Sequence, residues 1–144
     1  MRHRWMLIVL VLLLLASCGG GSAASQTSEE VHARWVEALR ANDRQTLLDL
    51  AAETEYKAAT VDQTLNRMQD YIKHGYVAMG VRGGPLQGVD ILPMEDSGQG
   101  KTGYSLWRFA SACICYAAEL IPTDAGWKVR SWGQRSTCPG ATGG

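Results

Sequence analysis

The stretch CICYAAELIPTDAGWKV, residues 113–129, decides the fold because it predicts a β-hairpin with one buried face. Two runs of apolar and aromatic residues flank the turn-forming segment PTDAG. We predict that Leu120 lies opposite Trp127, and the same register places Glu119 opposite Lys128 on the exposed face. A shift of one residue in this register would move every side chain of a strand to the opposite face of the sheet. The predicted buried face holds Ile114, Tyr116, Ala118, Leu120, Trp127 and Val129.

The same strand pattern continues through the chain from residue 76 onward. β-Branched and aromatic residues gather in short runs that glycine-containing breaks separate. The predicted strands cover residues 76–81, 89–94, 104–109, 113–121 and 127–132. We therefore expect an antiparallel sheet of four to five strands.

Three helices are predicted to precede this sheet. The first ends near Ala41 and starts with a capping box, in which Glu30 follows Thr27 by three residues. Asp43 can cap a short second helix, and a third covers about residues 60–74 before a glycine. Helices followed by an antiparallel sheet predict an α+β fold, with three N-terminal helices packed on a curved sheet.

This plan resembles the nuclear transport factor 2-like superfamily over residues 28–134. The resemblance rests on the turn LRANDR, residues 39–44, and on the closing pair CYAAEL and GWKV, residues 115–120 and 126–129. It implies a cone-shaped domain with a cavity between helices and sheet. The superfamily includes isomerases, cyclases, hydratases and non-catalytic binding or dimerisation modules. We expect four side chains to line the cavity: Trp35, Met68, Tyr116 and Trp127.

Residues 1–17 predict a lipoprotein signal peptide. Arg2 and Arg4 precede an apolar run, residues 5–15, and two small residues follow it. As a helix the apolar run would rise about 16 Å, roughly half of the ~30 Å hydrocarbon core of a bilayer. A cleaved export signal therefore explains the segment better than a permanent transmembrane span.

Cys18 is the predicted lipidation site. It ends LASC, residues 15–18, which resembles the lipobox of bacterial lipoproteins. Residues 18–27 would then form a flexible tether, and acyl chains such as palmitate would hold the protein on the extracytoplasmic side of a membrane in the cell envelope. The alternative is an ordinary signal peptide that is cut after Ala24.

Composition predicts one globular domain, which we place at residues 28–138, followed by a disordered tail at residues 139–144. The 144 residues are 46% apolar and 19% charged, and the formal net charge is zero. Without a basic patch, no nucleic-acid partner is expected. The expected partners are the membrane, through the lipid anchor, and either an envelope protein or a small apolar ligand, with a homodimer as a further candidate.

Three cysteines remain once Cys18 is assigned to the lipid: Cys113, Cys115 and Cys138. Disulfides persist in exported proteins, so we expect Cys138 to pair with Cys113 or Cys115. The predicted register puts residue 109 opposite Cys138, so the bridge requires the tail to curl back. Three free thiols are the alternative. No metal site is predicted, because zinc needs four well-spaced ligands.

Residues for acid–base chemistry do not form a recognisable set. Isomerases of the superfamily use a carboxylate base with Tyr or acidic donors, a set that cannot be aligned with this chain. Tyr116 is expected to face the interior and His74 to close the third helix, where structural roles explain both. The other polar candidates are Asp90, Tyr104 and Arg108.

The segment GQGKT, residues 98–102, imitates the end of a phosphate-binding P-loop. Glu95 stands where the first glycine of that motif should be, and a predicted strand follows in place of a helix. A hairpin loop explains these residues, and no cofactor is predicted.

The leading functional hypothesis is therefore an exported, membrane-anchored lipoprotein with a non-catalytic ligand- or protein-binding domain. Two alternatives remain: a small cavity enzyme of the isomerase or dehydratase kind, and a structural dimerisation module. The dimerisation module would need an apolar outer sheet face, with Trp107 and Trp132 as its candidate residues.

Overall fold

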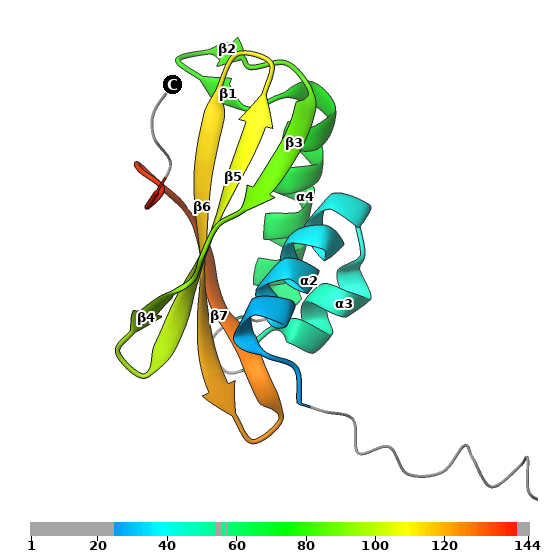
Figure 1. Cartoon of the computed structure of the whole chain (residues 1–144). Coiled ribbons are helices and arrows are strands. Elements are labelled where there is room, and N and C mark those ends of the chain that lie inside the picture. Colours follow the sequence, from blue (N-terminus) through cyan, green and yellow to red (C-terminus); the bar gives the residue numbers. More distant parts are fainter. Residues whose placement is uncertain (1–24, 54–55, 57, 141–144) are drawn as a thin grey trace, which may run out of the picture.

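The computed structural model describes residues 25–53, 56 and 58–140, and within them three helices pack on an antiparallel sheet (Figure 1). This confirms the predicted α+β class. The predicted signal peptide and Cys18 lie outside the described residues, as do residues 18–24 of the predicted tether and 141–144 of the predicted tail. No helix in the described ranges is long and apolar enough to cross a membrane.

The helices begin at the polar caps that the sequence indicates. Thr27 Oγ1 accepts a hydrogen bond from the Glu30 amide (3.2 Å), and the Glu30 carboxylate accepts one from the Thr27 amide (2.9 Å). Asp43 accepts a hydrogen bond from the Thr46 amide (3.0 Å) at the start of the next helix. These caps satisfy amides that have no partner within the helix. The helices are α2 (Ser28–Ala41), α3 (Arg44–Leu50) and α4 (Ala58–His74).

The main sheet of the described chain has five strands in the order β3–β5–β6–β7, with β4 pairing to the other part of β5. All pairings in it are antiparallel. In Figure 1 the three helices lie on one side of this twisted sheet, and α2 begins near the tip of the β6–β7 hairpin. The strands are β3 (Leu86–Ile91), β4 (Glu95–Ser97), β5 (Gly100–Phe109), β6 (Cys113–Thr123) and β7 (Gly126–Arg135).

The predicted register of the β6–β7 hairpin is wrong by two residues. Leu120 lies opposite Val129 rather than Trp127, which pairs with Pro122. The cause is a tighter turn. Thr123 pairs with Gly126, so both strands extend closer to the end of the hairpin than the pattern predicts. A slip of two residues keeps every side chain on its predicted face, because side chains alternate with a period of two.

A β-bulge in β7 produces a second difference from the predicted register. Leu120 pairs with Val129 but Glu119 pairs with Ser131, so Arg130 is an extra residue in the ladder. Glu119 therefore does not face Lys128, and its carboxylate accepts a hydrogen bond from the Arg130 guanidinium (3.1 Å). Beyond the bulge the alternation of inward and outward side chains is reversed.

Trp132 consequently faces the helices and not the outer side of the sheet, and Trp107 on β5 faces the helices as well. Trp132 pairs with the buried Ala118 and packs against the hydrophobic core. Trp107 pairs with Ile114 and is fully buried. The apolar outer face that the dimerisation alternative requires therefore does not contain these two tryptophans.

The predicted strand at residues 76–81 is a separate small hairpin. Its strands are β1 (Val77–Ala78) and β2 (Val81–Arg82), joined by Met79 and Gly80, which both have positive φ angles. Two successive residues of positive φ are typical of the tight turn that a two-residue hairpin requires. The predicted strand at 89–94 likewise lies earlier, as β3, and the Glu95–Ser97 strand was not predicted.

Helix α2 approaches the sheet closely where His32 meets Gly103. The imidazole lies against the backbone of β5, and a Cβ at position 103 would be 2.6 Å from its Cγ. His32 is fully buried, and neither ring nitrogen has a hydrogen-bond partner among the described residues. Burial lowers the pKa of His32 from 6.5 to about 4, because desolvation disfavours the charged imidazolium.

A disulfide joins Cys115 to Cys138, with their Cα atoms 5.4 Å apart, and Cys113 is free and exposed. Strand β7 ends at Arg135, opposite Cys115, and the chain then turns back to bring Cys138 over the sheet. The Cys138 sulfur also lies 3.8 Å from the carbonyl of Ser105 in β5. The bridge therefore fixes the end of the domain to its central strands.

Removal of the disulfide should lower the free energy of unfolding by about 3 kcal/mol in the chain-entropy model, since it closes a loop with a sequence separation of 23. We expect this loss for C115S in urea unfolding under oxidising conditions. The matched variant C113S, two residues away, should unfold like the wild type. Equal losses in both variants would contradict the assignment.

The burial of His32 should make stability depend on pH. Between pH 6.5 and 4 the unfolded chain binds a proton at His32 that the folded chain excludes. The free energy of unfolding should therefore fall as pH decreases through this range, by at most about 1.4 kcal/mol per pH unit. H32L removes the titrating imidazole but keeps all carboxylates. Urea titrations at pH 7 and pH 5 should therefore show that the free energy of unfolding falls less in H32L than in the wild type. An identical loss would disprove the assignment.

Candidate functional site

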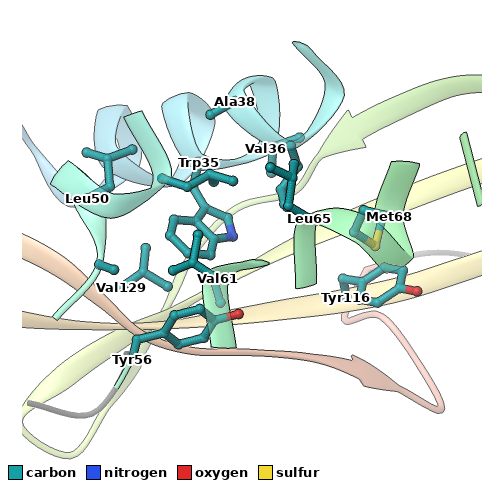
Figure 2. Close-up of a cluster of buried hydrophobic side chains, with 14 of the residues drawn as sticks. Trp35, Val36, Ala38, Leu50, Tyr56, Val61, Leu65, Met68, Tyr116 and Val129 are labelled. Atoms are coloured by element: carbon teal, nitrogen blue, oxygen red, sulfur yellow. The ribbon is translucent and has the colours of Figure 1, made fainter. Parts of the chain in front are cut away.

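Packed side chains fill most of the space between the helices and the sheet. Three of the four residues expected to line a cavity, Trp35, Met68 and Tyr116, are at most 4% exposed and belong to one core cluster (Figure 2). Trp35 meets the ring of Tyr56 edge-on, with 5.4 Å between ring centroids. These side chains therefore pack against one another in place of lining a large open chamber.

Trp127, the fourth expected cavity residue, lies elsewhere. It is half-buried near the β6–β7 tip, where it borders a groove together with Val31 and Leu50. The structure thus separates it from Tyr116, which lies further along the hairpin.

A small pocket remains at the rim of the core, between α4 and the β6–β7 hairpin. We call it the rim pocket; its volume is about 60 Å³. Tyr116 and Trp132 form one wall, where their rings stack with 5.1 Å between centroids and an interplanar angle of 3°. The rim pocket is lined by Thr64, Arg67, Met68, Tyr71, Tyr116, Trp132, Gly133 and Gln134.

Hydrogen-bond donors dominate the polar groups of the rim pocket. Arg67 has no ion pair with any carboxylate in the described ranges, and the hydroxyl of Tyr116 has no hydrogen-bond partner there. Gln134 accepts a hydrogen bond from the Tyr76 hydroxyl (3.3 Å) through Oε1, which leaves its amide nitrogen available. The buried Nε1 of Trp132 also lacks an acceptor among the described residues. The lining residues include no Asp or Glu.

Tyr116 stays protonated at neutral pH. Burial is the main cause that raises its pKa, and the nearby phenols of Tyr71 and Tyr76 raise it further, while Arg67 lowers it. A phenol with a raised pKa acts as a hydrogen-bond donor and does not serve as a general base near pH 7. In the rim pocket Tyr116 can therefore orient an acceptor group.

The remaining polar candidates from the sequence do not converge on this pocket. His74 Nδ1 lies 2.9 Å from Asp70 at the exposed end of α4. Asp90 and Arg108 form an ion pair (2.7 Å) between β3 and β5. The Tyr104 hydroxyl donates to Glu95 (3.3 Å); desolvation raises the pKa of Tyr104, and the Glu95 carboxylate raises it further.

The glycine-containing segment 98–102 forms the β4–β5 hairpin. Ser97 pairs with Gly100, and Lys101 and Thr102 already belong to strand β5. Lys101 donates a hydrogen bond to the Glu29 carboxylate (3.2 Å). Because a strand follows the glycines, the segment lacks the helix N-terminus that a P-loop uses to hold phosphate.

Two larger grooves lie near the tip of the β6–β7 hairpin. Their volumes are about 550 and 690 Å³, and both are open to solvent. Lys128 borders both, and its Nζ contacts the carbonyl of Asp49. The rim pocket is smaller, but it has a cation and no carboxylate among its lining residues, whereas carboxylates accompany the cations that line both grooves.

The sequence interpretation missed most residues of the rim pocket. Arg67, Tyr71 and Gln134 carry no motif that singles them out, and Trp132 was assigned to the wrong face. A partial signal exists for Arg67 and Tyr71, because Arg67 follows Thr64 by three residues and Tyr71 follows Arg67 by four, which are helical spacings on α4. The sequence therefore indicates that these residues share one face of α4. That this face lies beside Gln134 depends on the bulge in β7.

Comparison with protein-family models gives no match, and neither does comparison with curated proteins. Among solved structures, the chain is similar to the crystal structure of a "Putative NTF2-like transpeptidase" from Campylobacter jejuni, with a TM-score of 0.54 and 15% sequence identity. The likeness covers 72% of this chain and 97% of that chain. At this identity the likeness shows the fold alone, and the described domain has the nuclear transport factor 2-like (NTF2-like) fold.

Proposed function

We propose that the protein is an exported lipoprotein, anchored to a membrane of the cell envelope through Cys18, whose NTF2-like domain binds a ligand or a protein without transforming it. One observation carries the binding role: the rim pocket presents Arg67, Tyr116 and Gln134 as donors, with no Asp, Glu or His among its lining residues. Such a set can hold an acceptor group, but it supplies no general base.

A cavity enzyme of the isomerase or dehydratase kind finds less support in this geometry. Isomerases of this fold use a carboxylate in the cavity, and here the interior is occupied by side chains such as Trp35 and Met68. His32 is buried in the core but contacts Gly103 and does not line the rim pocket.

The activity named for the Campylobacter jejuni protein is also not supported for this chain. A transpeptidase needs a nucleophile that an adjacent base activates. Thr64 is the aliphatic hydroxyl in the rim pocket, and it shares a 2.5 Å hydrogen bond with the Tyr56 hydroxyl. Burial raises the pKa of Tyr56, so its hydroxyl stays protonated near pH 7 and cannot take the proton of Thr64.

Dimerisation through the outer sheet face is disfavoured by the charges there. Ion pairs join Asp90 to Arg108 and Glu119 to both Arg130 and Arg135. An obligate homodimer interface is typically more apolar than this.

The lipid anchor would place the rim pocket outside the bilayer. Helix α2 starts near the β6–β7 tip, so the predicted tether, residues 18–27, would bring that end of the domain close to the membrane (Figure 1). Trp132 lies six residues along β7 from Gly126, which corresponds to about 20 Å at ~3.3 Å per residue. A water-soluble ligand of the envelope fits this position better than a lipid chain.

Binding without conversion can be tested with the full chain purified in detergent. We expect calorimetric titration with soluble cell-wall fragments and envelope polymers to identify a ligand that mass spectrometry then recovers unchanged. Chemical conversion of the ligand would support the enzyme alternative. An absence of binding to every fragment, together with no envelope protein retained by the immobilised chain, would refute the proposed role.

Attachment through Cys18 can be tested by expression in a bacterial host with an alkyne analogue of palmitate. We expect the wild type to be labelled and to fractionate with membranes. C18A should lose the label, because the thiol at position 18 that would receive the lipid is removed, whereas C113S should keep it. Label retained by C18A, or a mature N-terminus after Ala24, would overturn the assignment.

A further inference from the structure

We propose that the rim pocket binds a terminal carboxylate of a small ligand, with Arg67 as the charged partner and Tyr116 and Gln134 as neutral donors. This inference rests on the proposed binding function and names the chemical class that the pocket accepts.

The first argument is the unequal balance of donors and acceptors. Arg67 offers a planar fork of N–H groups that matches the two oxygens of a carboxylate. The Tyr116 hydroxyl and the Gln134 amide nitrogen add two donors from the opposite wall, and neither has an acceptor among the described residues. Trp132 Nε1 is a buried donor without an acceptor among the described residues, and a buried unpaired donor is costly, so a ligand oxygen that reaches it would relieve that cost.

Charge limits the ligand to a single negative group. Arg67 is the cation among the lining residues, and no carboxylate lines the pocket to oppose an anion. A phosphate monoester carries close to two negative charges at neutral pH and is usually held by several cations or by a helix N-terminus. A carboxylate carries one charge, which a single guanidinium can neutralise.

Size points to the same conclusion. At about 60 Å³, the rim pocket has room for only a few heavy atoms. Pockets for drug-sized molecules are about five times larger or more. The rim pocket can therefore enclose a carboxylate and one neighbouring carbon, while the rest of the ligand stays outside.

The aromatic walls would orient the planar group. Tyr116 and Trp132 are stacked almost in parallel, and Tyr71 lines the pocket as well. Tyr71 is itself held edge-on against Tyr76, with 5.2 Å between ring centroids. Rings that already pack against one another lose little freedom when the ligand enters.

The test uses the full chain in detergent micelles, with ¹⁵N-labelled tryptophan. The probe is N-acetylglycine at pH 7 and constant ionic strength, and the readout is the Trp132 indole signal, which the W132F variant assigns. We expect a saturable shift of this signal. N-acetylglycinamide, which has the same shape but no charge, should give no saturable shift.

R67Q should raise the Kd for N-acetylglycine by up to about fivefold, because an ion pair with the exposed guanidinium is lost. Y116F should weaken binding to a smaller extent, because it removes a neutral donor but keeps the ring. K73Q is the matched control: it makes the same charge change on α4 at an exposed position outside the pocket, and should leave the Kd unchanged.

Equal responses to N-acetylglycine and its amide, or equal effects of R67Q and K73Q, would overturn the assignment. An envelope ligand whose calorimetric affinity is the same for wild type and R67Q would overturn the carboxylate site alone. It would leave the proposed binding role intact.

Discussion

The apolar inner face of the β6–β7 hairpin is the surface on which the helices assemble. Helix α2 contacts β5, β6 and β7, and α3 contacts β7. The segment after α3 adds to the edge of the hairpin, where the Ala52 amide donates to the carbonyl of Val129 (2.8 Å). Loss of this face would leave α2 and α3 without a partner for their apolar stripes, and short helices gain most of their stability from such packing.

Much of the fold follows from local patterns that are independent of tertiary context. The capping box of Thr27 and Glu30 and the cap of Asp43 use groups within one helical turn, so the sequence places these helix starts almost to the residue. The alternation along β6 identifies its inner face for the same reason. The register of β6 against β7 is different, because it depends on whether two residues or five form the turn, and the segment PTDAG permits both.

The candidate site is less predictable because its parts come from different elements. Arg67 and Tyr71 lie on a helix whose apolar stripe explains its pattern without them, and Gln134 lies near the end of a strand. Their meeting depends on the position of α4 over the sheet and on the face that Trp132 adopts. Likewise, nothing local in the sequence around His32 shows that Gly103 will accept its ring.

The extra residue at Arg130 divides strand β7 into one part that builds the core and one part that lines the rim pocket. Val129, before the bulge, belongs to the hydrophobic core, whereas Trp132 and Gln134, after it, belong to the rim pocket. A single inserted or deleted residue at this point would exchange Trp132 and Gln134 for their neighbours while leaving the packing of Val129 unchanged. Related chains could therefore differ completely in what they recognise and still fold around the same interior.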